Sequence, residues 1–188
     1  MPDLIYPQGS VRILGRQKAT GLVEILPAVE ENGLVYGSAS RKYCHENGIL
    51  HPVVHLHIVD RFSRLCLQKR SDGKEVCPSM WDTAVGGHVG FGEYALEALS
   101  REAQEELGLS DFNPHLIDDY IWENGRDREL VFVFAIVGSY HLSPDRDEVS
   151  EVKNWEMEEI EKMMGKGVFT PQFEQEFPRI KNKLLSLL

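Results

Sequence analysis

The chain has 188 residues, of which 42% are hydrophobic, enough to bury one sizeable core. Its 30 acidic and 20 basic residues give a formal net charge of −10. A strongly acidic surface repels the nucleic-acid backbone, so nonspecific nucleic-acid binding is disfavoured. An anionic substrate would require a divalent metal or a local basic cluster to offset the same repulsion.

The cysteines and the apolar runs of the sequence indicate the cellular compartment of the protein. Cys44, Cys66 and Cys77 form an odd set without a close pair, which fits neither a disulfide framework nor a structural zinc site. We find neither the apolar core of a signal peptide nor a run that could span a bilayer. We therefore expect a cytoplasmic protein without membrane or nucleic-acid partners. Residues 1–22 are expected to be an N-terminal extension, either an added strand, a dimer arm or disordered, before a single domain at 23–188. A homodimer therefore stays an open alternative.

Strands are predicted along much of this domain. Residues 22–41, "LVEILPAVEENGLVYGSASR", contain two short strands joined at Asn32-Gly33, a strong hairpin signal. Residues 51–60, "HPVVHLHIVD", alternate apolar residues with His55 and His57, and the same alternation in "RLCLQKR" predicts a second strand with one polar face. The apolar run "RELVFVFAIVG" is typical of a strand covered on both faces.

Three segments predict helices. One is the helix within residues 86–109, "GGHVGFGEYALEALSREAQEELGL", which glycine turns precede. The others are "SEVKNWEMEEIEKMM" and "TPQFEQEFPRIKNKLLSLL", the latter interrupted at Pro178. Strands on both sides of one glutamate-rich helix predict an α/β or α+β fold with helices on a mixed sheet.

The glutamate-rich helix has two predicted faces. An apolar stripe expected to face the sheet consists of Leu96, Leu99, Ala103 and Leu107. Glu102, Glu105 and Glu106 lie at i, i+3 and i+4, so their carboxylates share another face, with only small Ala95 and Ala98 beside them. Such a face can be a solvated surface, but adjacent carboxylates repel each other and a bound cation relieves the repulsion. Hard oxygen ligands favour Mg²⁺ or Mn²⁺.

Residues 87–109 resemble the Nudix box, G-x5-E-x7-R-E-U-x-E-E-x-G-U. The matching positions are Gly87, Glu93, Arg101, Glu102, Ala103, Glu105, Glu106, Gly108 and Leu109. Ala103 stands where a larger aliphatic residue is usual. The resemblance implies a Nudix-like α/β/α sandwich with a mixed β-sheet. It also implies that the protein is a metal-dependent pyrophosphohydrolase. Such an enzyme directs water onto the phosphorus of a small-molecule pyrophosphate, such as a nucleoside diphosphate linked to another moiety.

The same resemblance assigns roles to individual residues. The implied metal site comprises Glu102, Glu105, Glu106 and Gly87. Residues implied to serve catalysis are Glu93, Arg101, Glu102, Glu105 and Glu129. Glu93 and Arg101 would brace the loop and helix, while Glu102 is the first choice as general base. Glu129 is the alternative base, because the position of the base varies within this superfamily.

A narrower resemblance, over much of residues 23–138, is to Nudix proteins related to isopentenyl-diphosphate isomerase. Those isomerases use a cysteine before a glycine-histidine pair, a glutamate on a later strand and a histidine-rich metal site. Residues at or near the corresponding positions are His45, His51, His88 and Glu129. Gly86 stands at the cysteine position, and glycine cannot act as an acid or base, so hydrolysis is favoured over isomerisation. A module that senses a nucleotide without cleaving it is a third alternative, against which the intact glutamates weigh.

Substrate contacts are less specific in the sequence. Arg70, Lys74 and His88 are candidate substrate-binding residues, the first two for phosphate, although a basic run at a strand end is usually just exposed. The other histidines of residues 45–57 are more often hydrogen-bonded or solvated than metal-bound. The leaving group is not specified, because specificity lies in loops and pocket shape.

Overall fold

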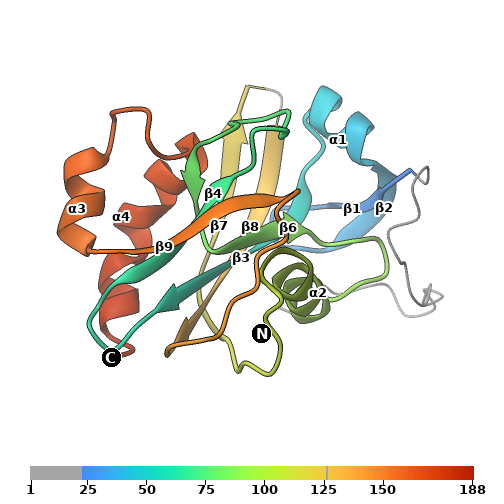
Figure 1. Cartoon of the computed structure of the whole chain (residues 1–188). Coiled ribbons are helices and arrows are strands. Elements are labelled where there is room, and N and C mark those ends of the chain that lie inside the picture. The colour runs from blue at the N-terminus through green and yellow to red at the C-terminus, as the bar shows by residue number, and fades with distance from the viewer. Residues whose placement is uncertain (1–22, 126) are drawn as a thin grey trace. The chain divides into compact units, whose positions relative to one another are not determined.

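The computed structural model describes residues 23–125 and 127–188, so the N-terminal extension expected at 1–22 lies outside the described part (Figure 1). These residues divide into two units. The first contains residues 23–54, Gly87–Ala98 and, apart from residue 126, Asp119–Phe132. The second contains His55–Gly86, Leu99–Asp118 and Val133–Leu188.

The described residues form mixed α and β structure. The strands are β1 (Ile25–Val29), β2 (Val35–Ser40), β3 (His51–Val59), β4 (Leu65–Arg70), β5 (Trp81–Asp82), β6 (Val85–His88), β7 (His115–Asn124), β8 (Asp127–Val137) and β9 (Val149–Trp155). The helices are α1 (Arg41–Asn47), α2 (Ala95–Leu107), α3 (Met157–Met163) and α4 (Pro171–Leu185). A seven-stranded sheet has the order β5-β4-β3-β8-β7, with β6 paired to β3 and β9 to β4. The predicted α+β class with a mixed sheet is confirmed.

The first unit opens with the predicted hairpin. Strands β1 and β2 pair antiparallel, from Ile25 opposite Ser40 to Val29 opposite Val35. Gly33 in the turn has a φ of 81°, a left-handed conformation that glycine adopts without a Cβ penalty. The hairpin signal at Asn32-Gly33 is therefore confirmed.

Helix α1 follows the hairpin and lies beside it (Figure 1). Ser40 caps its N-terminus by accepting a hydrogen bond from the Tyr43 N–H at 3.2 Å. Gly48 ends it with a φ of 63°. Sequence patterning did not predict this helix, because seven residues present only one buried side chain, Cys44.

In the second unit, the segment 150–164 differs from the prediction of one helix. Its first part belongs to β9, which pairs antiparallel with β4, and only the second part forms α3. Residues Val149 and Trp155 at the two ends of β9 are buried. Pairing with β4 thus overrides the local helical tendency of the glutamate-rich sequence.

Helix α4 runs through Pro178 without the predicted interruption. Thr170 caps it by accepting from the Phe173 N–H at 3.2 Å. Proline lacks one helical hydrogen bond, but buried residues lie on both sides of it along the helix. These are Phe173, Glu176, Phe177, Ile180 and Leu184. An ion pair of 2.5 Å between Lys181 Nζ and Glu161 Oε1 also links α4 to α3, which lies beside it (Figure 1).

The two strands richest in apolar residues are buried along most of their length. Residues 130–136 of β8 are buried, which confirms a strand covered on both faces. All nine residues of β3 are also buried, so the prediction of a strand with one polar face was wrong for β3. His55 and His57 are enclosed because a carboxylate of α4 pairs with both rings.

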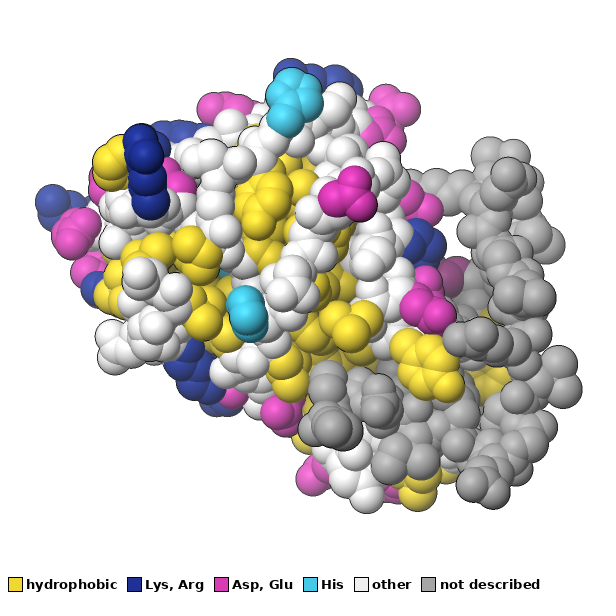
Figure 2. All heavy atoms as spheres, turned by 90° about the horizontal axis from the view of Figure 1, so that it is seen from below, with side chains coloured by type: hydrophobic (Ala, Val, Ile, Leu, Met, Phe, Trp, Pro, Cys, Tyr) yellow, Lys and Arg dark blue, Asp and Glu magenta, His cyan; other side chains and the backbone are white. Residues whose placement is uncertain are grey.

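Charged side chains of both signs lie on the surface, and the three cysteines are unpaired with one another. On the face shown in Figure 2, the described Lys and Arg side chains are scattered among acidic and hydrophobic ones. Cys44, Cys66 and Cys77 are free thiols. Among the described residues, no helix is both long and apolar enough to cross a membrane.

Candidate functional site

Helix α2 carries the glutamates of the predicted site. Its fully buried residues are Ala95, Ala98, Leu99, Ala103 and Leu107. Leu96 is 49% exposed, so its predicted place in the sheet-facing stripe was wrong. The two small alanines are buried instead, and the buried side of α2 is therefore centred nearer Glu102 and Glu106 than the hydrophobic pattern indicated.

Glu106 is a buried carboxylate, with only 7% of its surface exposed. Its Oε2 accepts hydrogen bonds from the Gly86 N–H at 3.2 Å and from Gln68 Nε2 at 3.0 Å. Burial and then the nearby Glu102 carboxylate raise its pKa to about 8. The two hydrogen bonds and the charge of Lys74 lower this pKa but do not outweigh burial and Glu102, so a cation bound beside the carboxylate would stabilise the ionised form.

Arg101 joins the other two glutamates of the helix. Its Nη1 lies 2.5 Å from Glu102 Oε1 and 3.6 Å from Glu105 Oε2. All three side chains are partly buried. The arginine therefore holds both carboxylates on one side of α2.

The glycine loop before α2 belongs to the first unit. Glu93 Oε2 accepts from the Gly90 N–H at 2.9 Å, and the Glu93 N–H donates to the Gly90 carbonyl at 3.0 Å. Gly92 between them has a φ of 87°. This reciprocal pair of hydrogen bonds closes the loop on itself. Gly87 and His88 precede this loop in β6.

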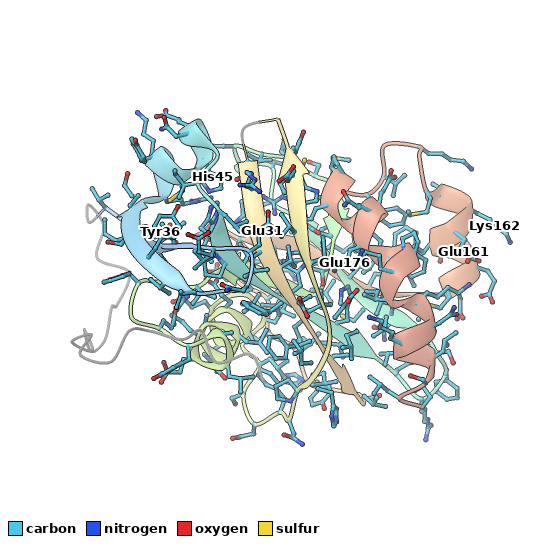
Figure 3. All side chains as sticks on the ribbon, turned by 180° about the vertical axis from the view of Figure 1, so that it is seen from behind. Glu31, Tyr36, His45, Glu161, Lys162 and Glu176 are labelled. Atoms are coloured by element: carbon cyan, nitrogen blue, oxygen red, sulfur yellow. The ribbon has the colours of Figure 1, made fainter. Side chains whose placement is uncertain are left out.

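Three histidines converge in the first unit, and Figure 3 labels one of them, His45 of α1. His45 Nε2 lies 3.2 Å from His88 Nε2. The ring of His51 stacks on that of His88 with a centroid distance of 5.3 Å. One ring nitrogen from each of the three residues falls within 4.8 Å of the others.

The outer nitrogens of two of these rings are held by oxygen atoms. His45 Nδ1 pairs with Asp127 Oδ2 at 2.9 Å, and His51 Nδ1 donates to the Ile49 carbonyl at 2.8 Å. Such bonds orient a metal-binding imidazole and fix its tautomer. His51 Nε2 is buried and has no hydrogen-bond partner among the described residues. Burial lowers the pKa of His51, which favours the neutral ring that a metal requires.

Two carboxylates of β8 extend this histidine cluster. Asp127 and Glu129 form a second group of atoms within 4.8 Å together with His45 and His51. Asp127 Oδ1 is also buried without a partner in the described part of the chain. Glu129 was a predicted site residue, but Asp127 was not. Their spacing of two residues in a strand, which puts both on one face, was the signal that could have found Asp127.

The basic candidates for phosphate binding already have acidic partners. Arg70 Nη1 lies 3.5 Å from Asp82 Oδ2, and Lys74 Nζ donates to Glu148 Oε2. Both lie in the second unit, as do the α2 glutamates that were expected to bind metal. A phosphate at either residue would therefore compete with a carboxylate.

Residues 49–173 match the NUDIX domain family, and the chain belongs to this family. It is a hydrolase that acts on pyrophosphate bonds. The uncharacterized Nudix hydrolase SCO1686 of Streptomyces coelicolor is 32% identical over 162 residues, which cover 84% of this chain and 88% of that protein. The uncharacterized Nudix hydrolase YfcD of Escherichia coli is 30% identical over 138 residues, covering 72% and 76%.

Solved structures show the same fold. DR0079 from Deinococcus radiodurans superposes with a TM-score of 0.73 at 20% identity, covering 83% of this chain and 98% of that chain. The NUDIX domain of Shewanella oneidensis NrtR, complexed with ADP ribose, gives a TM-score of 0.58 at 13% identity, covering 71% and 87%. The narrower resemblance to isopentenyl-diphosphate isomerase stays a prediction.

Proposed function

We propose that the protein is a metal-dependent pyrophosphohydrolase that cleaves a nucleoside diphosphate linked to another moiety, or a similar organic pyrophosphate. The buried Glu106, with its pKa raised to about 8 beside Glu102, carries this proposal. A site that holds a second acidic group so close is suited to a cation. ADP-ribose, bound by the NrtR domain, is a nucleoside diphosphate joined to a sugar and is the first substrate to test.

Glu102, Glu105 and Glu106 would hold Mg²⁺ or Mn²⁺, because three carboxylates offer the oxygen donors that these ions prefer. When bound, the ion would offset the negative charge of the phosphoryl oxygens and lower the pKa of the attacking water. Gly86 and Gln68 hold the Glu106 carboxylate in place through its Oε2. Glu102 accepts the proton of the attacking water. Arg101 holds the Glu102 carboxylate on the side of α2 that carries the other glutamates. Glu129 is the alternative base.

Turnover of a pyrophosphate panel tests this function. The purified protein, with Mg²⁺, is incubated with ADP-ribose, nucleoside triphosphates, nucleotide sugars, dinucleotides and isopentenyl diphosphate, and the products are identified. The variant Glu105→Gln is expected to lose about a hundredfold or more in turnover, since it removes a charged ligand. The control, Gln104→Ala, alters an exposed neighbour on the same helix and is expected to keep wild-type turnover.

The outcomes separate the alternatives. Unchanged turnover in Glu105→Gln would defeat the assignment of the glutamates. Tight binding of a nucleotide without cleavage would indicate the sensing module, and conversion of isopentenyl diphosphate to its isomer would indicate the isomerase.

We propose further that the histidine cluster of His45, His51 and His88 holds a second divalent metal, with Asp127 and Glu129 available as oxygen donors. Two nitrogens bound to one tetrahedral zinc would stand about 3.4 Å apart, given zinc–nitrogen distances of about 2.1 Å. His45 Nε2 and His88 Nε2 are 3.2 Å apart. Imidazole donors favour zinc or cobalt over magnesium, in contrast to the glutamates of α2.

Cobalt(II) absorption tests the histidine cluster without any substrate. Titration of the metal-free protein is expected to produce visible bands of nitrogen-bound cobalt, which His51→Gln removes and Glu105→Gln retains. His115→Gln, at an exposed position, is the control. Bands of full intensity in His51→Gln would contradict a metal in this cluster.

A further inference from the structure

Glu176 of α4, labelled in Figure 3, is fully buried between two histidines of β3. His55 Nδ1 donates to its Oε2 at 2.8 Å, and His57 Nε2 donates to its Oε1 at 2.6 Å. Burial alone would raise the pKa of this carboxyl. The charge of His55 and the hydrogen bonds of both rings outweigh burial and hold the pKa well below its ordinary value. Glu176 is therefore ionised and fixes the orientation of both rings.

The opposite edge of the His55 ring faces Gly86. A Cβ placed on Gly86 would lie 3.4 Å from His55 Cδ2 and 3.7 Å from His55 Nε2. The imidazole thus occupies the space into which a larger side chain at position 86 would extend. An added Cβ would meet the ring at ordinary van der Waals distance, so the ring lies about one methyl group away from the Gly86 backbone.

That backbone in turn holds the proposed metal ligand. The Gly86 N–H donates to Glu106 Oε2 at 3.2 Å. Glu176 is thus hydrogen-bonded to His55, the His55 ring lies next to Gly86, and the Gly86 N–H is hydrogen-bonded to Glu106. All four residues belong to the second unit.

The N-terminus of α4 reaches the same segment by another route. Thr170, the N-cap of α4, donates from Oγ1 to Asp82 Oδ1 at 2.9 Å. The same oxygen accepts from the Thr83 N–H at 2.9 Å, three residues before Gly86. The N-cap of α4 thus contacts the segment that leads to Gly86 directly, and Glu176 reaches it through His55.

Docking of α4 does not require a buried charge. The same helix face carries Phe173, Phe177, Ile180 and Leu184, all buried. Apolar residues in place of a buried ionic network often stabilise a fold at least as well. The ionised Glu176 is thus better explained by the orientation that it imposes on His55 than by attachment of the helix.

We propose that Glu176 and His55 are positioning residues for the proposed metal ligand Glu106, so that α4 contributes to the hydrolase site through Gly86. This inference rests on the proposed function, since it concerns a glutamate of the same site. Loss of the carboxylate frees the His55 ring, relaxes the Gly86 backbone and weakens the hold on Glu106.

Magnesium affinity, measured by calorimetry on the full chain, tests the inference without a substrate. Mg²⁺ is chosen because imidazole nitrogens bind it poorly. Glu176→Gln and His55→Gln are each expected to weaken Mg²⁺ binding about tenfold, the lower end of losses caused by residues behind a metal ligand. The double variant is expected to lose no more than the larger single loss, because both changes act through one contact.

The control is Phe177→Leu, which trims the same buried face of α4 and leaves the Glu176 carboxylate in place. At a melting temperature comparable to that of Glu176→Gln, its Mg²⁺ affinity is expected to stay within about twofold of wild type. Equal weakening in this control, independent losses in the double variant, or absence of Mg²⁺ binding would overturn the inference. If Glu176→Gln does not fold, His55→Gln against the same control decides. A protein that shows the expected Mg²⁺ pattern but cleaves nothing refutes the proposed function and leaves the positioning role standing.

Discussion

Glu106 and Glu176 are two buried carboxylates in the same unit whose pKa values are shifted in opposite directions. Glu106 on α2 accepts from an amide N–H and a glutamine, and its pKa is raised to about 8 by burial and by Glu102. Glu176 on α4 accepts from two histidines, and its pKa is lowered. Burial opposes ionisation at both sites, so the partners account for the difference.

The contrast distinguishes a carboxylate whose hydrogen bonds are supplied by the fold, Glu176, from one that is suited to bind a cation, Glu106. Glu176 accepts a hydrogen bond on each oxygen from a histidine supplied by the fold, and its site is complete without a ligand. Glu106 has neutral donors and an acidic neighbour, so an added divalent ion would improve its electrostatics. Partner chemistry, rather than burial, therefore supports the proposal that Glu106 is the metal ligand of the pair.

The largest effect on stability is expected from Glu176→Ala. This change leaves His55 and His57 buried without their shared carboxylate and opens a cavity under α4. Loss of one partner from a buried charged network costs about 3 to 5 kcal/mol of unfolding free energy. Urea denaturation at neutral pH measures the loss.

The exposed neighbour Gln175 provides a control for that experiment. Gln175→Ala is expected to change stability by less than about 0.5 kcal/mol. A similarly small effect of Glu176→Ala would show that the two histidines do not depend on the carboxylate, and the contrast with Glu106 would fail.

Glu106→Gln is expected to raise the free energy of unfolding of the metal-free protein, whereas Glu176→Ala lowers it. The folded-state pKa of about 8 lies above the ordinary value of 4.5, so the folded protein holds this proton more tightly than the unfolded chain. Its contribution to stability is fully present below the unfolded value and is lost as pH rises through about 8. Glu106→Gln, which carries no charge, is expected to be more stable than wild type at alkaline pH by about 1 to 3 kcal/mol.

Thermal unfolding in the presence of a chelator, at about pH 5 and about pH 9, measures this effect. The advantage of the variant should appear at the higher pH and shrink at the lower one. Added Mg²⁺ is expected to stabilise wild type more than the variant. An equal difference in stability at both pH values would show that Glu106 does not carry a raised pKa.

The local part of the site could be predicted from sequence, and the long-range part could not. Helical spacing alone places Glu102, Glu105 and Glu106 on one helix, since i, i+3 and i+4 contacts depend only on local geometry. The pairing of His55 with Glu176 spans 121 residues. No periodicity in either segment encodes it, because it arises only once α4 packs on β3.

The errors over two strands have the same origin. The helical reading of residues 150–164 was wrong over β9 because the pairing partner, β4, lies far away in sequence. The alternation in β3 correctly predicted a strand, but a polar residue in an alternating pattern does not reveal whether water or a buried carboxylate faces it. In both strands, a partner far away in sequence decided what the local pattern could not.

The smallest stability effect is expected from Gly108→Ala, at the end of α2 that carries Glu106. Gly108 has a φ of 61°, and a Cβ there would lie 3.2 Å from both Ser143 Cβ and the Ser143 carbonyl oxygen. The segment after it is fixed to the helix end, since the Asp145 N–H donates to the Glu106 carbonyl at 2.9 Å. The left-handed conformation of the alanine and its close approach to Ser143 are together expected to lower the free energy of unfolding by about 1 to 2 kcal/mol. Gly73→Ala, where the nearest atom to the added Cβ is 4.0 Å away, is the control in the same unit and should cost less than about 0.5 kcal/mol in urea denaturation. Equal effects of the two changes would mean that the turn after α2 yields easily, and the burial of Glu106 would then have to depend on Gly86 and Gln68 rather than on a rigid helix end.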